Sequence, residues 1–230
     1  MENSQKKKLP KNYSELLIHY NRYNGYNDYN NYTYYMNSER TLIIIKPDAV
    51  KRGLIGTIIE TFEKPGLKLL AAKMVQPEAD VIKNHYPGND PKWITEIGNK
   101  TIASFKQAGA DVQKIMGTAD PLKLGKHVYD RLIKYWQEGP IVVMVFEGPN
   151  AVVVARKLRG HTVPALAEPG TLHAAYSYDS STLSFSLDRV VKTFIHASGS
   201  IEEAEREIHY WFKGVKFENY KRETDDLYLI

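Results

Sequence analysis

The stretch Thr41-Leu42-Ile43-Ile44-Ile45-Lys46-Pro47-Asp48 joins an unbroken run of aliphatic, mostly β-branched residues to a sharp stop at Lys46-Pro47. Such a run predicts a strand buried on both faces, because a strand with one face in water alternates polar and apolar residues. Pro47 is well placed to open a helical turn. Beyond it, apolar residues at helical spacing between residues 55 and 62 predict an amphipathic helix that ends at Pro65-Gly66.

The rest of the chain continues this alternation of strands and helices. We expect further strands over 67–75 and 141–147 and within 184–195, and further helices over 77–86, 129–137, 150–158 and 201–212. The stretch 87–127 is polar and irregular in pattern, with at most a short helix over 101–107, and 160–170 is expected to be a loop. This order predicts an α+β or α/β sandwich, in which helices pack on a sheet.

Residues 1–38 differ in composition from everything that follows. Between residues 13 and 35, tyrosine and asparagine recur as pairs such as Tyr20-Asn21 and Tyr26-Asn27, and aliphatic residues are almost absent after Ile18. Low-complexity sequence of this kind buries too little apolar surface to fold, so we expect a disordered arm. A tolerated extension and a binding arm both stay open. The folded domain is expected over residues 39–230.

The composition sets outer limits on function. The 230 residues contain no cysteine, which excludes disulfides, thiolate metal sites and cysteine nucleophiles. The longest strongly apolar run, 141–146, is far shorter than a membrane span, and no signal peptide is visible. A net charge of +4 does not indicate a nucleic-acid partner. We therefore expect a soluble cytoplasmic protein with no membrane and no specific nucleic-acid partner.

The segment 194–207 carries the most chemical information. His196 closes an apolar strand and is followed by a turn of small residues and then a helix. Ser200 and Glu203 form a capping-box pattern, in which each side chain bonds the other residue's backbone N–H at the helix start. An imidazole held beside the free N–H groups of a helix N-terminus suits nucleophilic phosphoryl transfer. A capped histidine in an ordinary loop is the alternative.

Several motifs, taken in order, resemble one family. Residues 40–56, RTLIIIKPDAVKRGLIG, closely resemble the N-terminal motif of nucleoside diphosphate kinases. Further matches follow in the family's order: His85-Tyr86, residues 139–148, Arg156, Thr162 with Pro164, Pro169-Gly170-Thr171 and the segment around His196. The resemblance spans about 40–212 and includes an insertion at about 87–127, as in long-form members. It implies a ferredoxin-like α+β sandwich, an antiparallel sheet flanked by helices.

The resemblance also implies a ping-pong phosphotransferase. His196 would take the γ-phosphate from ATP or another nucleoside triphosphate, become a phosphohistidine, and pass the group to a nucleoside diphosphate. An imidazole of ordinary pKa is roughly three quarters neutral at pH 7, so it needs no added base. Glu207 matches the family glutamate that orients the ring. Lys46 matches the lysine that contacts the sugar hydroxyl and the transferring phosphate.

The same resemblance assigns the nucleotide-binding residues. Arg156 and Thr162 match phosphate ligands, Tyr86 matches a tyrosine near the histidine, and Val128 and Leu132 match the positions on which the base stacks. Mg²⁺ would arrive on the nucleotide phosphates and not in a protein cage. Stacking without hydrogen bonds to the base edges implies broad base specificity. Family members assemble as homotetramers or homohexamers, so a homo-oligomer is expected.

Four positions depart from the family pattern. His173 stands where a phosphate-binding arginine is usual, and Thr193 where an asparagine holds the sugar hydroxyl. Val128 stands in place of the aromatic residue that stacks on the base, and Gly199 in place of a common aspartate. Loss of one charged phosphate contact could slow the reaction by about two to three decades, with partial compensation if His173 is protonated.

These departures leave two alternatives to an active kinase. One is a catalytically weakened relative that binds nucleotide and acts as a regulatory or scaffold protein. The other is an assembly protein driven by the Tyr/Asn-rich arm, with the kinase domain incidental.

Overall fold

The computed structural model describes residues 38–218 and 220–222. The Tyr/Asn-rich arm expected over 1–38 lies outside the described residues, apart from Ser38, which begins the first strand.

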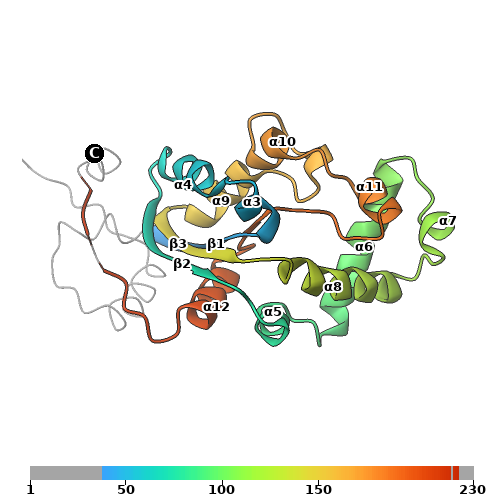
Figure 1. Cartoon of the computed structure of the whole chain (residues 1–230), viewed down its shortest axis with the longest axis horizontal. Helices are drawn as coiled ribbons and strands as arrows, with labels where there is room; N and C mark the ends of the chain where they lie inside the picture. Colours follow the sequence, from blue (N-terminus) through green and yellow to red (C-terminus); the bar gives the residue numbers. More distant parts are fainter. Residues whose placement is uncertain (1–37, 219, 223–230) are drawn as a thin grey trace, which may run out of the picture.

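Four strands form one antiparallel sheet in the order β2-β3-β1-β4 (Figure 1). Their bounds are β1 Ser38–Ile45, β2 Lys68–Val75, β3 Ile141–Pro149 and β4 Ile195–Ala197. In the centre, Ile44 of β1 pairs with Val143 of β3 on one side and with His196 of β4 on the other. The lack of polar alternation in β1 follows from this position, because both of its faces are covered.

Helices flank the sheet on both faces. The bounds of these helices are α4 Ile55–Glu63, α5 Ala79–His85, α8 Pro121–Trp136, α9 Ala151–Arg159 and α12 Ile201–Trp211. Alternate residues of β1 point to opposite faces, so Ile43 and Ile45 pack with residues of α4 and α9 while Leu42 and Ile44 pack with residues of α5, α8 and α12. This arrangement confirms the predicted α+β sandwich with an antiparallel, ferredoxin-like sheet.

The expectation of an irregular stretch over 87–127 is wrong. The stretch holds α6 (Pro91–Gln107), α7 (Val112–Met116) and the first turns of α8. Asp90 and Asp120 each accept a hydrogen bond at 2.9 Å from the backbone N–H two residues on, just before a proline at the first helical position. These Asp-Pro pairs combine a cap with a preset φ angle and so start both helices.

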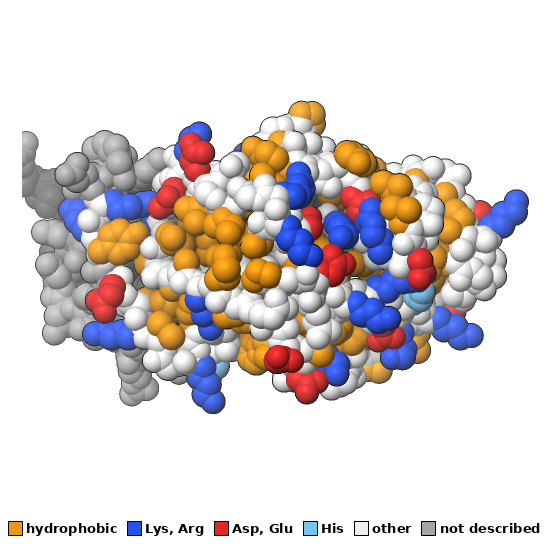
Figure 2. Space-filling view, viewed as in Figure 1, with side chains coloured by type: hydrophobic (Ala, Val, Ile, Leu, Met, Phe, Trp, Pro, Cys, Tyr) orange, Lys and Arg blue, Asp and Glu red, His pale blue; other side chains and the backbone are white. Residues whose placement is uncertain are grey.

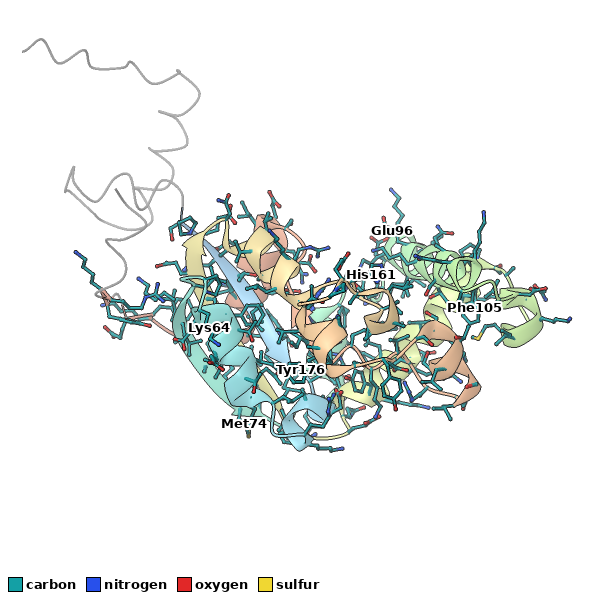
Figure 3. All side chains as sticks on the ribbon, turned by 90° about the horizontal axis from the view of Figure 1, so that it is seen from above. Lys64, Met74, Glu96, Phe105, His161 and Tyr176 are labelled. Carbon is teal, nitrogen blue, oxygen red and sulfur yellow. The ribbon has the colours of Figure 1, made fainter. Side chains whose placement is uncertain are left out.

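The two long helices of this region cross at glycines. A Cβ on Gly98 of α6 would lie 1.8 Å from the carbonyl oxygen of Pro121, and one on Gly125 of α8 would lie 1.9 Å from that of Ile94. Phe105 lies with α6 at the end of the molecule away from the sheet, where α7 and α11 (Ser181–Ser186) also lie (Figures 1 and 3). A small separate core therefore holds this end together; its buried residues are Phe105, Val112 and Leu124.

The strand expected within 184–195 is reduced to Ile195, the first residue of β4. The second half of α11, a turn and a link without helix or strand occupy this stretch instead. Asp179 holds the link, because its carboxylate accepts hydrogen bonds from the Arg189 guanidinium at 3.0 Å and from the Lys192 backbone N–H at 2.7 Å. These side-chain contacts replace the ladder that a neighbouring strand would supply. Three short helices complete the described fold: α3 Pro47–Lys51, the 3-10 helix Pro164–Leu166 and α10 Leu172–Tyr176.

The surface is mixed in charge. On the face seen in Figure 2, Lys and Arg side chains are interspersed with Asp and Glu and do not form one continuous basic stripe. Among the described residues, every helix is too short or too polar to cross a lipid bilayer.

Candidate active site

His196 lies in the short strand β4, one residue before the strand ends. Its side chain is 11% exposed, and its Nε2 lies 3.0 Å from Oε2 of Glu207, which is 1% exposed. Strand, turn and helix bring the two residues together, since β4 leads through Ser198, Gly199 and Ser200 into α12. The contact engages Nε2 and leaves Nδ1 as the ring nitrogen available for chemistry.

Ser198 fixes the carboxylate of Glu207. Its Oγ donates to Glu207 Oε2 at 2.7 Å, and it is itself held by β1, because its backbone N–H donates to the Leu42 carbonyl at 3.2 Å. The side chain of Ser198 is fully buried. The sequence marks Ser198 only as a small turn residue, so its function as a ligand of Glu207 could not be read from it.

His85, at the end of α5, lies on the other side of the same carboxylate. Trp211 Nε1 donates to His85 Nδ1 at 3.2 Å, which places the proton of the neutral ring on Nε2. That Nε2 lies 3.6 Å from Glu207 Oε1, too far for a strong hydrogen bond, and its side chain is completely buried. Burial, followed by the effect of His196, lowers the pKa of His85 to about 3. The sequence placed His85 beside Tyr86 but gave it no function.

Burial also shifts the pKa values of His196 and Glu207. It lowers the pKa of His196 far below 6.5, with the positive charge of Lys46 as the second cause. It raises the pKa of Glu207, opposed chiefly by His85 and by the hydrogen bond from Ser198. At neutral pH the ring of His196 is therefore uncharged, and its nucleophilic lone pair is not blocked by a proton.

Lys46 follows β1 directly and is 3% exposed. Its Nζ donates to Thr193 Oγ1 at 2.6 Å and lies 5.5 Å from the ring centre of Tyr135 and 5.6 Å from that of Trp136. Burial lowers the pKa of Lys46 to about 7, although Asp48 opposes the shift. The ammonium is thus partly desolvated, which favours a strong interaction with an incoming anion.

The C-terminal end of α9 and the residues after it carry three of the relevant polar groups. Arg156 is exposed, whereas Arg159 is only 8% exposed. Arg159 Nη2 donates to Thr162 Oγ1 at 3.3 Å, so the predicted phosphate donor Thr162 is in contact with a second arginine that the sequence did not single out. The sequence signal was weak, because basic residues commonly occupy the last turn of a helix.

His173 does not supply the missing cation. It is completely buried in α10, and its Nδ1 donates to the His161 carbonyl at 2.7 Å. Burial lowers the pKa of His173 to about 4, so the ring is neutral at physiological pH. The expectation that a protonated His173 offsets the loss of the usual arginine is therefore wrong.

The predicted base-binding positions lie on α8, and Tyr86 lies close to the histidine. Val128 and Leu132 are one helical turn apart and both are partly buried. The Tyr86 ring lies 6.4 Å from the His196 ring and stacks on Trp93 at 5.6 Å. The aromatic partner Trp93 comes from α6, in the part of the chain whose helices the sequence did not predict.

The capping box at the start of α12 is confirmed in one of its two bonds. The Glu203 backbone N–H donates to Ser200 Oγ at 3.2 Å, as predicted. The Glu203 carboxylate, however, accepts from the backbone N–H of Gly199 at 2.8 Å and not from that of Ser200. A Cβ at Gly199 would lie 2.4 Å from Glu203 Oε2, so an aspartate here would force Glu203 to move.

A neutral histidine, an orienting carboxylate and several cations beside it are what nucleophilic phosphoryl transfer requires. Comparison with known proteins agrees with this class. The family model described as nucleoside diphosphate kinase matches residues 39–123 and 122–217, in two parts that meet inside the expected insertion. The nucleoside diphosphate kinase of Pyrobaculum aerophilum is 46% identical over 178 residues, covering 77% of this chain and 97% of that protein. Nucleoside diphosphate kinase A of Canis lupus familiaris is 36% identical over 185 residues, covering 80% and 93%.

Solved structures give the same result. A crystal structure of an NDP kinase from Pyrobaculum aerophilum matches with a TM-score of 0.72 at 44% identity, covering 77% of this chain and 97% of that chain. A structure of nucleoside-diphosphate kinase from Borrelia burgdorferi, a transition-state mimic with bound vanadate and ADP, matches with a TM-score of 0.65 at 34% identity, covering 83% and 96%. The chain belongs to the nucleoside diphosphate kinase family, and its activity is that of a nucleoside-diphosphate kinase.

The contact between Glu207 and His196 leads to a first prediction. Glu207→Gln keeps the size of the side chain but removes the negative charge that holds and stabilises the ring, so we expect phosphate transfer to slow by roughly 10- to 100-fold. Stopped-flow measurement of the transfer from ATP to the protein would test this. Glu205→Gln is the matched control on the same helix, because the Glu205 side chain is 45% exposed and pairs with Arg40, away from His196. Equal rates for both variants would contradict an orienting role.

Proposed function

We propose that this chain carries out its kinase reaction through Nδ1 of His196. The lone pair of Nδ1 forms a bond to the γ-phosphorus of a nucleoside triphosphate while the bond to the β–γ bridging oxygen breaks. The nucleoside diphosphate leaves with that electron pair. In the second step a terminal phosphate oxygen of an acceptor diphosphate attacks the phosphohistidine, and the electron pair returns to Nδ1. The observation that carries this proposal is the 3.0 Å contact that commits Nε2 to Glu207.

The remaining predicted residues fit around this nitrogen. Lys46 and Arg156 would neutralise charge on the phosphate oxygens, and Thr162 would donate a hydrogen bond to them. Thr193 accepts a hydrogen bond from Lys46 at 2.6 Å, so its own hydroxyl proton stays available for the sugar. Because Lys46 contacts Thr193, its ammonium would lie between the sugar, which Thr193 would bind, and the phosphates.

Base binding would rely on apolar contact. Val128 and Leu132 on α8 offer side chains against which any base can pack, while Tyr86 lies beside His196. Contact without hydrogen bonds to base edges separates bases poorly, so we propose that ATP, GTP and other nucleoside triphosphates all act as donors.

Mg²⁺ would enter this site bound to the nucleotide and not to protein ligands. Among the described residues, His85, His196 and Glu207 bring potential ligand atoms within 4.8 Å of one another, but two of the three are imidazoles. Mg²⁺ prefers oxygen ligands and keeps several waters, so the nucleotide phosphates would hold it and it would neutralise their charge.

We further propose that the enzyme acts in the cytoplasm as a homotetramer or homohexamer.

Labelling of the intact protein tests the proposal. Incubation with ATP labelled on the γ-phosphate should place acid-labile, alkali-stable label on the protein, and mass spectrometry should locate it on His196. Addition of unlabelled GDP should discharge the label and yield labelled GTP. A protein that binds ATP but takes up no label would instead support the regulatory or scaffold alternative.

A further inference from the structure

Arg159 is a buried cation without an acidic partner among the described residues. Its side chain is 8% exposed, and no ion pair of the described part of the chain includes it. Its two hydrogen bonds go to neutral oxygens, from Nε to the Gly160 carbonyl at 3.2 Å and from Nη2 to Thr162 Oγ1 at 3.3 Å. Buried charges in proteins are normally paired or bind a charged ligand. The carboxylate of Glu203 lies near enough to raise the pKa of Arg159 but forms no ion pair with it, so no anion of the described residues contacts the guanidinium.

The surroundings of Arg159 indicate where that anion would lie. Its guanidinium is close enough to lower the pKa values of Lys46 and His196. Burial and the charge of Arg156 lower the pKa of Arg159 to about 10, although Glu203 opposes the shift, so the guanidinium stays protonated. Arg156 precedes it by three residues on α9 and therefore lies on the same side of the helix. Thr162 connects it to the predicted phosphate position.

Arg159 and His173 both form hydrogen bonds to the short loop 160–162. Arg159 bonds Gly160 and Thr162, while His173 bonds the carbonyl of His161 between them. His173 stands where the family usually has a phosphate-binding arginine, and it is buried with its Nε2 unpartnered. The two side chains therefore approach one short loop, but only Arg159 brings a charge to it.

We propose that Arg159 is a phosphate-binding residue of this enzyme and supplies, from α9, the guanidinium that position 173 lacks. A guanidinium has five N–H donors in a planar fork. Two of them are used on Gly160 and Thr162, which fix its plane, and the other three stay available for phosphate oxygens. The ligand is the di- or triphosphate group of the nucleotide, so this inference rests on the proposed function.

Isothermal titration calorimetry of the full-length protein with ADP and with adenosine tests the assignment. Arg159→Leu should weaken ADP binding by roughly 10- to 100-fold, as for one lost charge-assisted phosphate contact, and leave adenosine binding within about twofold. Arg159→Lys keeps the charge but not the fork, so ADP binding should fall by less and adenosine binding should again be unchanged. Lys157→Leu is the matched control, because Lys157 is an exposed residue of the same helix.

The outcomes separate this assignment from other roles of Arg159. Unchanged ADP binding in Arg159→Leu, or an equal loss of ADP and adenosine binding in a folded variant, would overturn it. If Arg159→Leu does not fold, Arg159→Lys decides, and ADP affinity equal to that of the wild type would overturn it. ADP binding does not require a phosphohistidine. A wild-type protein that never takes up phosphate would therefore defeat the proposed function, while the calorimetry would still decide on Arg159.

Discussion

Replacing His196 by alanine is expected to lower phosphate transfer from ATP to GDP by at least ~10⁴-fold and to abolish the acid-labile label. The loss is this large because the reaction has two halves and both use the same nitrogen. Under the proposed function Lys46, Arg156 and Thr162 hold the triphosphate without the ring, so ATP should still bind with an affinity close to that of the wild type. A coupled assay for GTP formation and equilibrium titration with ATP would measure the two effects separately.

Folding of this variant needs its own control. Without the ring, Oε2 of buried Glu207 loses one partner but keeps the hydrogen bond from Ser198, so a loss of about 1–3 kcal/mol in the free energy of unfolding is expected. Urea unfolding would check it. His209→Ala is the matched variant, because His209 is an exposed histidine of α12. Label retained by His196→Ala, or lost equally from His209→Ala, would place the nucleophile elsewhere.

The sequence predicted the central layer of the fold well. Three of the four strands lie close to their expected ranges, because runs such as that of β1 are apolar on both faces and admit few other structures. The order of elements then led to a sheet covered by helices. The antiparallel order of the strands came from the family resemblance, since no local pattern determines which strands pair.

The wrong predictions concern segments whose structure is determined by tertiary contacts and not by local sequence. The polar composition of 87–127 predicts an irregular stretch, although Asp90-Pro91 and Asp120-Pro121 are both helix-start patterns. The glycines at 98 and 125 weaken the intrinsic helical signal, but they are what allows α6 and α8 to approach closely. In the same way, the 187–194 link is held by Asp179 and not by strand pairing.

In the candidate site, too, residues placed by local sequence were predicted and residues placed by tertiary contacts were not. His196, Glu207 and the start of α12 belong to one strand–turn–helix unit, so local sequence could place them together. His85 reaches Glu207 through packing between elements distant in sequence, whereas Ser198 belongs to the same unit as Glu207 but is held in place by the Leu42 carbonyl of β1. In the sequence Arg159 is one of several basic residues in the last turn of a helix. Only its burial and its contact with Thr162 distinguish it from the others.

Replacing Lys46 by methionine is expected to slow phosphate transfer by about 10²- to 10³-fold and at the same time to stabilise the folded protein. The pKa of this lysine falls from 10.5 in the unfolded chain to about 7 in the folded one, chiefly because of burial. Below pH 7 the folded state must hold a desolvated charge, and this cost disappears as the pH rises from about 7 to 10.5. Methionine carries no charge, so the gain in unfolding free energy should be on the order of 5 kcal/mol below pH 7 and should fade towards pH 10.

The wild-type pH profile follows from the same shift. As the pH rises through about 7, Lys46 in the free enzyme loses its proton, so kcat/KM should decline on the alkaline side. His196, whose pKa is already far below 6.5, should produce no loss between pH 6 and 7. Lys51→Met on α3 is the control, since Lys51 is exposed and should change neither rate nor stability appreciably. A Lys46→Met protein that is less stable than the wild type but equally fast would contradict this prediction. It would mean that Lys46 stabilises the hydrophobic core and does not bind phosphate, because only a residue retained for its charge lowers stability while it raises the rate.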